Sequence, residues 1–280
     1  MTDISAIGVI YTDSNGKSHR AFVRHKGEVI LSAGTIRSPQ LLLLSGIGPY
    51  HNLSSLNIPI IYHQPNVGKF MFDNPRKAIT LIIPFPIELS YIQVVGITSD
   101  YFIESISFVQ PYSPTPSPFS LFPTPLSVAN LSLGDITEKI PGPLSEGSLW
   151  LSLPANVKSN PLVRFNYFAD PRDLSRCVSR MRKIGEMLDT KSMDRFKYND
   201  YKGARGFMFY GPSLPMNLSD DSLMEEFCRN TVSTIYHYHG GCLVGKVVYG
   251  DFRVLGIKAL RVVDAPTFAP TPGTNPQATL

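Results

Sequence analysis

The sequence predicts a mixed α/β (α+β) fold, and three observations support this prediction. Residues 28–49 contain a strand, a glycine turn and a short helix, the unit from which parallel sheets are built. Residues 142–173 alternate apolar and polar side chains between turn signals, which is typical of antiparallel strands with one buried face. Residues 170–190 carry apolar side chains at helical spacing. The chain is therefore expected to combine parallel and antiparallel strands with helices.

The bulk composition excludes several classes of protein. The chain has 280 residues, 43% of them hydrophobic and 17% charged, which is typical of a globular protein with a sizeable core. The net charge is only +4, and there is no lysine or arginine block and no nucleic-acid motif. No stretch approaches the roughly 18 apolar residues of a membrane span. We therefore expect no nucleic acid as partner and no membrane span, and we also expect a monomer.

The first part of the chain is predicted to form short strands and then a helix. The segment "DSNGK", with Asn15, predicts a hairpin with a type I′ turn. "GEVILSAG" is an apolar, β-branched run, as expected of a buried parallel strand. In "TIRSPQLLLLSGIGP", Ser38 suits the helix cap, Pro39 suits the first helical position, and Gly46 ends the helix.

Two helices and a strand are predicted further along the chain. The first helix begins at Asp170 or Asp173, either of which can cap it, and the second runs from Asp220. The strand at residues 260–263 ends in Asp264. Ligand sites of α/β proteins gather at such carboxyl ends, so this aspartate is a candidate binding residue.

The segment "TIYHYHGGCLVG" contains two histidines, His237 and His239, one residue apart. Two histidines on the same side of a strand could bind a metal, but no H-E-x-x-H or C-x-x-C motif and no nearby acidic residue accompanies them. We therefore expect no metal. The alternatives are histidines packed in the core, or a general base beside a cofactor. Gly240 and Gly241 would let a ligand approach the backbone closely.

A second candidate is Asn275 in "TPGTNPQ". Its amide could donate a hydrogen bond to a substrate oxygen, although an asparagine before a proline is also an ordinary turn residue. The sequence contains no G-x-G-x-x-G fingerprint, no P-loop and no G-x-S-x-G motif. The common dinucleotide, nucleotide and serine-hydrolase signatures are therefore absent from the sequence.

The order of these segments resembles the glucose–methanol–choline (GMC) family of FAD oxidoreductases. Five segments carry the resemblance, and they occur in the family's order: "GTIRSPQLLLLSGIGP", "DNP" at residues 73–75, "GSLWLSLPANVKSNPLVRFNYFADPRDL", "HYHGGCLVG" and "LRVVDAPTF…TPGTNPQAT". Within the family, the chain most resembles the plant (R)-mandelonitrile lyases and their lyase-like relatives. The resemblance extends over nearly the whole chain.

The resemblance implies a specific domain organisation. It predicts part of a Rossmann-like FAD-binding domain, and a substrate domain with a mostly antiparallel sheet flanked by helices. Residues 1–80 would belong to the FAD-binding domain, residues 81–235 to the substrate domain, and residues 236–280 again to the FAD-binding domain. The family's carboxyl-terminal part would begin near residue 140. The glycine fingerprint that holds the FAD diphosphate in the family is lacking, so we expect the chain to be truncated at both ends.

The resemblance also implies roles for individual residues. His237 would be the base that takes the proton from a substrate hydroxyl, and Asn275 would orient the substrate oxygen. Ile235 and Glu104 match positions in the substrate pocket. The residues that match positions lining the flavin are Tyr236, Asp264, Ala265, Pro276, Gln277 and Asn74.

Three departures from the lyases bear on the reaction. The lyases carry a histidine at the position of Asn275, a tyrosine at that of Ile235, and a cysteine at that of Glu104. A carboxylate near a departing cyanide should raise the barrier of the lyase reaction. We therefore expect an FAD-dependent oxidoreductase that acts on the CH–OH group of an alcohol. The alternatives are an (R)-mandelonitrile lyase that cleaves a cyanohydrin, and an inactive fragment that does not bind FAD.

The cysteines and the N-glycosylation sequons bear on the cellular compartment of the protein. The resemblance implies a disulfide between Cys177 and Cys228, with Cys242 left unpaired. The three N-x-S/T sequons are at Asn52, Asn130 and Asn217. A disulfide and sequons favour a secreted protein, and the family resemblance implies a secreted or vacuolar glycoprotein, although this chain shows no signal peptide.

Overall fold

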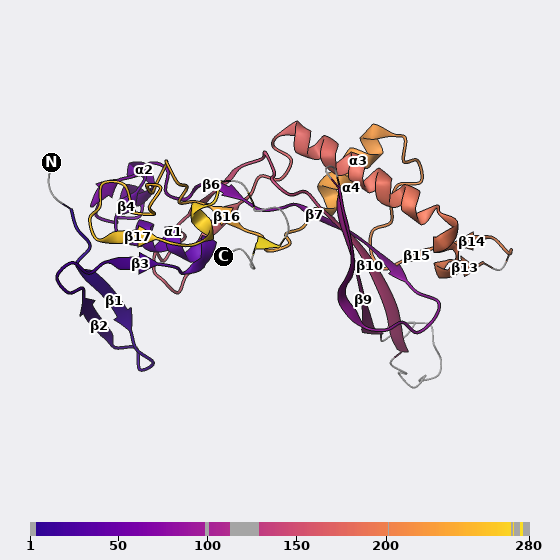
Figure 1. Cartoon of the computed structure of the whole chain (residues 1–280), viewed down its shortest axis with the longest axis horizontal. Coiled ribbons are helices and arrows are strands. Elements are labelled where there is room, and N and C mark those ends of the chain that lie inside the picture. Colours follow the sequence, from indigo (N-terminus) through magenta and orange to yellow (C-terminus); the bar gives the residue numbers. More distant parts are fainter. Residues whose placement is uncertain are drawn as a thin grey trace. The chain divides into compact units, whose positions relative to one another are not determined.

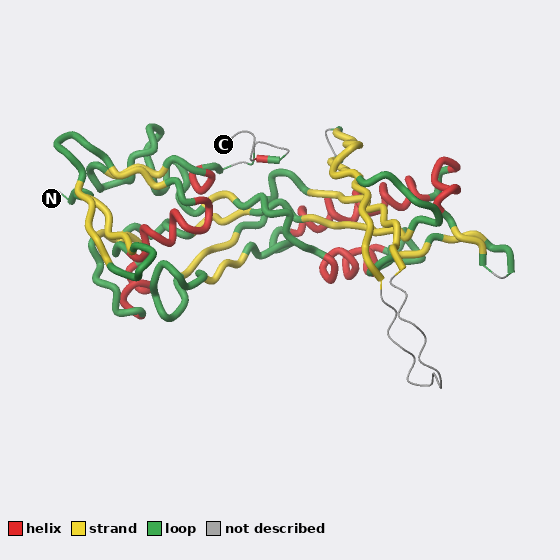
Figure 2. Tube along the Cα trace, turned by 90° about the horizontal axis from the view of Figure 1, so that it is seen from below, coloured by secondary structure: helices red, strands yellow, loops and turns green. Residues whose placement is uncertain are grey.

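The computed structural model describes residues 4–98, 101–112, 129–200, 202–269, 271, 275 and 276. The chain divides into two compact units. Unit 1 consists of Met1–Asn74, Pro141–Ala169 and Tyr236–Leu280, and unit 2 consists of Pro75–Ile140 and Asp170–Ile235. Both units combine helices, strands and loops (Figure 2).

The described part of unit 1 is built from short strands and two α-helices (Figure 1). Its described elements are β1 (Gly8–Thr12), β2 (Ser18–Phe22), β3 (Val29–Leu31), α1 (Gly34–Leu44), β4 (Ile47–Gly48), α2 (Tyr50–Ser55), β5 (Tyr62–His63), β6 (Lys69–Phe72), β11 (Gly147–Trp150), β12 (Leu162–Arg164), β16 (His239–Gly240), β17 (Leu260–Val262) and the 3-10 turn η2 (Ala265–Thr267). Strands β12, β11, β6 and β16 form an antiparallel sheet in that order. Strands β3 and β17 pair in parallel, as predicted, although Ile30 is 58% exposed rather than buried.

The strand pairing makes the unit boundaries differ from the domains expected from the sequence. Residues 141–169 lie in unit 1, although the sequence places them in the substrate domain at 81–235. The reason is that β11, within this segment, pairs with β6, with Gly147 opposite Met71. The first passage of the chain into unit 2 also comes earlier than residue 80, directly after Asn74.

Helix α1 begins before the predicted proline. Its first residue is Gly34, so that Pro39 lies inside the helix. The helix start is held by Asp264, whose Oδ2 accepts hydrogen bonds from the Gly34 N–H and, at 2.8 Å, from the Ser38 hydroxyl. A carboxylate at this end also interacts favourably with the helix dipole. The cap is therefore a distant residue, which local sequence does not reveal.

The β1–β2 hairpin forms as predicted, but with a different turn. Gly16 has a φ of 82°, whereas Asn15 is not left-handed, so the turn is not type I′. The Asp13 carboxylate explains this geometry, because its Oδ1 accepts the N–H groups of Asn15 at 3.0 Å and Lys17 at 2.9 Å.

Unit 2 contains a five-stranded antiparallel sheet and two longer helices among its described residues (Figure 1). Its described elements are β7 (Arg76–Ile82), β8 (Ser90–Ile97), β9 (Phe102–Tyr112), β10 (Ala129–Lys139), α3 (Pro171–Leu188), the 3-10 helix η1 (Lys191–Phe196), β13 (Tyr198–Asn199), β14 (Arg205–Gly206), β15 (Met208–Phe209) and α4 (Asp221–Thr231). The strand order in the large sheet is β15, β7, β10, β9 and β8. The mixed fold with mostly antiparallel sheets that the sequence predicts is thus confirmed.

The two faces of this sheet carry different side chains. Lys77 of β7 lies directly opposite Glu138 of β10, and both contact the helices: Glu138 binds Arg180 of α3 at 3.2 Å, and Lys77 donates to the carbonyl of Cys228 in α4. Because successive strand residues point to opposite faces, Lys139 belongs to the other face.

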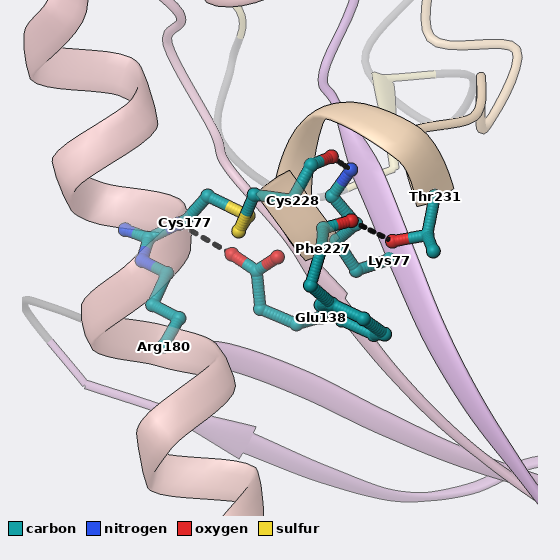
Figure 3. Close-up of a disulfide and its surroundings, with 7 residues drawn as sticks. All are labelled: Lys77, Glu138, Cys177, Arg180, Phe227, Cys228 and Thr231. Carbon is teal, nitrogen blue, oxygen red and sulfur yellow. Dashed lines mark hydrogen bonds and ion pairs between the residues drawn. A yellow bond between two sulfur atoms is a disulfide. The ribbon is translucent and has the colours of Figure 1, made fainter. Parts of the chain in front are cut away.

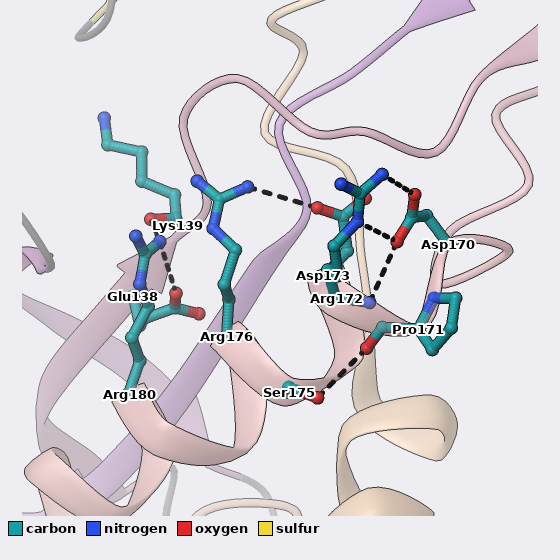
Figure 4. Close-up of polar contacts among 9 residues, drawn as sticks. All are labelled: Glu138, Lys139, Asp170, Pro171, Arg172, Asp173, Ser175, Arg176 and Arg180. Carbon is teal, nitrogen blue, oxygen red and sulfur yellow. Dashed lines mark hydrogen bonds and ion pairs between the residues drawn. The ribbon is translucent and has the colours of Figure 1, made fainter.

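Helix α3 starts where the sequence predicts. Of the two candidate caps, Asp170 accepts the Arg172 N–H at 2.9 Å, and its carboxylate also binds the Arg172 guanidinium (Figure 4). Asp173 instead binds Arg176 at 3.1 Å. The predicted apolar stripe is buried, and its members are Leu174, Val178, Met181, Ile184 and Leu188.

A disulfide joins the two helices of unit 2. Cys177 of α3 is bonded to Cys228 of α4, the pair that the family resemblance implies (Figure 3). Cys242 is a buried free thiol, and burial raises its pKa. Within the described ranges, no helix combines the length and the apolar character needed to cross a membrane.

Candidate functional site

His237 lies in unit 1, two residues before β16, and is held by two consecutive residues that follow β6. The His237 backbone N–H donates to Oδ1 of Asp73 at 3.0 Å, and its Nδ1 lies 3.2 Å from Nδ2 of Asn74. Pairing of β16 with β6 brings these segments together. All three residues are buried, with His237 9% exposed, Asp73 1% and Asn74 0%. Both the backbone and the ring of His237 are therefore fixed.

Asp73 is itself anchored by Tyr167, whose hydroxyl donates to Oδ2 of Asp73. The two carboxylate oxygens thus accept from different segments of unit 1. Because a carboxylate makes strong hydrogen bonds, this arrangement connects Tyr167, in the segment after β12, to the backbone of His237.

His239 orients the same backbone from the other side. Its Nδ1 lies 3.0 Å from the carbonyl oxygen of His237, so Nδ1 carries the proton and donates. The ring stacks on Phe72 with centroids 5.3 Å apart. Burial lowers the pKa of His239, which favours the neutral ring. His239 is thus a packed, hydrogen-bonded histidine of the core.

The two histidines do not share one strand, because β16 begins at His239. Among the described residues, no three His, Cys, Asp or Glu side chains gather as metal ligands. Gly240 and Gly241 have φ angles of 85° and 95°. A Cβ on Gly240 would meet the carbonyl oxygen of Phe70. Close packing against β6 therefore accounts for this glycine, without the ligand that the sequence suggested.

The residues expected to line a flavin lie at several places in unit 1. Asp264 and Ala265 follow β17, and the Asp264 carboxylate accepts the Ala265 N–H at 2.8 Å in addition to its bonds to the start of α1. Tyr236, directly before His237, is 77% exposed and has a φ of 63°. Asn275 is exposed and Pro276 is buried, whereas Gln277 lies outside the described residues.

Glu104 and Ile235, the two expected pocket residues, both lie in unit 2. Oε1 of Glu104 is 2.7 Å from Nζ of Lys139, and the two residues are only 4% and 1% exposed. The ammonium group also lies 4.1 Å from the centre of the Phe102 ring. The Glu104 carboxylate is thus neutralised by a cation, which weakens the argument from sequence that its charge opposes a departing anion.

Three residues of these networks are not identified by sequence reasoning: Asp73, Tyr167 and Lys139. The "DNP" segment contains Asp73, but nothing in the sequence links it to a histidine 164 residues away. For Lys139, the segment "DITEK" gave a possible signal, since charged residues recur in a strand whose neighbours are apolar. Tyr167 has no signal of this kind.

Comparisons with known proteins identify the class to which this fold and site belong. The family described as GMC oxidoreductase matches residues 2–76 and 143–280, which together make up most of the chain. The chain belongs to the GMC oxidoreductase family.

Several plant proteins are similar to the chain over nearly its whole length. (R)-mandelonitrile lyase 1 of Prunus serotina is 53% identical over 275 residues, which are 98% of this chain and 48% of the relative. The (R)-mandelonitrile lyase-like protein of Arabidopsis thaliana is 52% identical, covering 100% and 50%. A sinalpyl alcohol oxidase of Nesocodon mauritianus is 47% identical, covering 98% and 49%. The chain thus spans about half the length of the curated relatives it matches.

Solved structures support the same fold. A formate oxidase of Aspergillus oryzae superimposes with a TM-score of 0.77 at 20% identity, covering 99% of this chain and 56% of that one. A fungal aryl-alcohol oxidase gives a TM-score of 0.71 at 18% identity, covering 97% and 55%. At such low identity the likeness concerns the fold alone.

Proposed function

We propose that this chain contributes the catalytic base of an FAD-dependent oxidoreductase that acts on the CH–OH group of a small alcohol. The observation that carries the proposal is the double anchoring of His237 by Asp73 and Asn74, at 3.0 and 3.2 Å. Imidazole is suited to accept a hydroxyl proton because its reference pKa lies near neutrality. His237 would take that proton, and Asn275 would orient the substrate oxygen.

The residues present are compatible with a flavin in unit 1. The parallel strands β3 and β17 end side by side, with Asp264 bonded to Gly34, and ligands of α/β folds bind at such strand ends. Nothing lies within 4 Å of a Cβ built on Gly34, so this backbone is open to approach. Tyr236, Asp264, Ala265, Pro276 and Gln277 would be near the ring system. FAD, when bound, supplies the hydride acceptor.

A visible absorption spectrum tests the proposal. The purified 280-residue chain is mixed with FAD and desalted, and a resolved flavin band that survives supports the proposal. An aromatic alcohol added without oxygen should then bleach the band, and His237→Ala should abolish the bleaching. His25→Ala, at an exposed position of unit 1, is the matched control. If no flavin is retained, the chain is not a flavoprotein by itself, and the hypothesis of an inactive fragment replaces the proposal.

The second candidate is an (R)-mandelonitrile lyase, favoured by the 53% identity to a protein of that name. In that reaction His237 would again be the base, but a carbon–carbon bond would break and the flavin would stay oxidised. Mandelonitrile would then yield benzaldehyde and cyanide without bleaching. Assaying both products beside the flavin band in one sample separates the two candidates.

We also propose that the protein is a secreted or vacuolar glycoprotein. Disulfides such as Cys177–Cys228 persist in oxidising compartments. Asn130 and Asn217, in two of the three sequons, are exposed. Enzymatic removal of N-glycans from protein isolated from tissue should increase its gel mobility, and an unchanged mobility would contradict the proposal.

A further inference from the structure

The single amide group of the Asn74 side chain directs its nitrogen at His237, whereas its oxygen is unpaired within the described part of the chain. Nδ2 of Asn74 lies 3.2 Å from Nδ1 of His237, while Oδ1 is buried and has no hydrogen-bond partner among the described residues. Asn74 is 0% exposed, so bulk solvent does not reach that oxygen. A buried acceptor without a donor is unfavourable and requires an explanation.

We propose that Asn74 is a positioning residue that determines which ring nitrogen of His237 carries the proton. The inference rests on the proposed role of His237 as a base and deepens it. A neutral imidazole has one N–H and one lone pair, and the partner of one nitrogen decides the state of the other. Asn74 occupies Nδ1, so a proton from a substrate is taken at Nε2.

The two orientations of the Asn74 amide have opposite consequences for that step. If Nδ2 faces the ring, it donates to Nδ1, which places the ring proton on Nε2 and removes its lone pair. If Oδ1 faces the ring, it accepts the Nδ1–H, and Nε2 keeps its lone pair. The amide oxygen and nitrogen are nearly the same size, so the two orientations occupy the same space. In the second orientation Oδ1 takes the place of Nδ2 beside the ring, and Nε2 is the basic nitrogen.

Asp73 makes this selection geometrically possible. Asp73 accepts the His237 backbone N–H at 3.0 Å, and the next residue, Asn74, contacts the His237 ring. His239 fixes the His237 carbonyl, at 3.0 Å. With both peptide groups held, the ring cannot easily turn away from Asn74. The ring orientation and its protonation are thus controlled by one short segment, Asp73-Asn74.

Nitrogen-15 NMR of the full chain with labelled histidine tests this proposal without cofactor or activity. At a pH above the histidine titrations, His237 is expected in the Nδ1–H form, and its signal is assigned with His237→Gln. In Asn74→Leu, which keeps the volume but removes the acceptor, the Nε2–H form should appear. His239 is an internal control, because its Nδ1 bonds to a carbonyl and should stay Nδ1–H in both proteins. An Nε2–H form in the unmodified chain, or an unchanged Nδ1–H form in the variant, overturns the proposal.

Asn74→Asp provides a second test if the leucine variant loses the His239 signature and is therefore unfolded. A carboxylate at this position accepts from Nδ1–H and adds a negative charge, so the titration of His237 should move up by about 1 to 3 pH units. An unmoved titration contradicts the proposal. If the chain retains FAD and oxidises an alcohol, kcat/KM of Asn74→Leu should fall about 100-fold at neutral pH. If it retains none, the function proposed above fails, while the NMR result still decides the role of Asn74.

Discussion

The backbone N–H of His237 donates to Oδ1 of Asp73 at 3.0 Å, although 164 residues separate them in sequence. The two residues belong to distant segments of unit 1, which the pairing of β6 with β16 brings together. The carboxylate of Asp73, a residue that is 1% exposed, thus accepts a hydrogen bond from a backbone N–H. The candidate base is therefore held by the fold, and changes at Asp73 should affect both stability and the geometry of the site.

Replacing Asp73 by alanine should destabilise unit 1. The His237 N–H and the Tyr167 hydroxyl would each lose the carboxylate as acceptor, at a cost of about 1–3 kcal/mol in the free energy of unfolding. Tyr167→Phe removes only one of the two bonds and should cost about 1 kcal/mol. Urea unfolding of both variants checks the order of these effects. An Asp73→Ala protein as stable as the unmodified chain would show that the bond contributes nothing.

The buried pair of Glu104 and Lys139 predicts an asymmetric result for single and double variants. Lys139→Met leaves a buried carboxylate without its cation and should destabilise the protein by about 3–5 kcal/mol. The double variant Glu104→Leu/Lys139→Met replaces both charges by apolar side chains and should recover much of this loss. Chemical denaturation of the two proteins measures the difference. A double variant that is no more stable than Lys139→Met would mean that the two side chains do not interact.

Two buried residues on the helix-facing side of the sheet, Glu138 and Lys77, predict that the free energy of unfolding has a minimum near pH 7. Burial raises the pKa of Glu138 to about 7 from 4.5. Between these two values the folded state binds more protons than the unfolded state, so the free energy of unfolding falls as the pH rises from 4.5 to 7. Burial lowers the pKa of Lys77 to about 7 from 10.5, so stability rises again as the pH increases from 7 to 10.5.

Variants separate the two limbs of that pH dependence. Glu138→Gln should abolish the fall between pH 4.5 and 7, a change of about 1 to 3 kcal/mol, and leave the rise above pH 7. Lys77→Met should abolish the rise. Urea titrations at several pH values measure both limbs. Glu138→Gln with the same fall as the unmodified chain would show that another group causes it.

The disulfide between Cys177 and Cys228 should contribute strongly to the stability of unit 2. It closes a loop with a sequence separation of 51 residues, for which the chain-entropy estimate is about 4 kcal/mol. The double variant Cys177→Ala/Cys228→Ala should lose about that amount, and a reducing agent should produce a similar loss in the unmodified chain. Cys242→Ala, in unit 1, is the matched control for removal of a buried cysteine. Equal losses in the control would argue against a role for the cross-link.

The sequence by itself determined the elements whose signals are local. Asp170 followed by Pro171 predicts the start of α3, and the apolar stripe from Leu174 to Leu188 predicts which side of the helix is buried. These signals work because capping and helical periodicity depend on residues a few positions apart. The order of five segments was also sufficient to identify the family, since each segment has a recognisable sequence motif.

Only the tertiary structure decided which residues meet across long separations. It showed that Asp264 holds the start of α1, that Asp73 and Asn74 hold His237, and that Lys139 neutralises Glu104. A hydrogen bond or ion pair depends on a distance of about 3 Å in space. That distance is set by strand pairing and packing between segments remote in sequence, and no local pattern contains it.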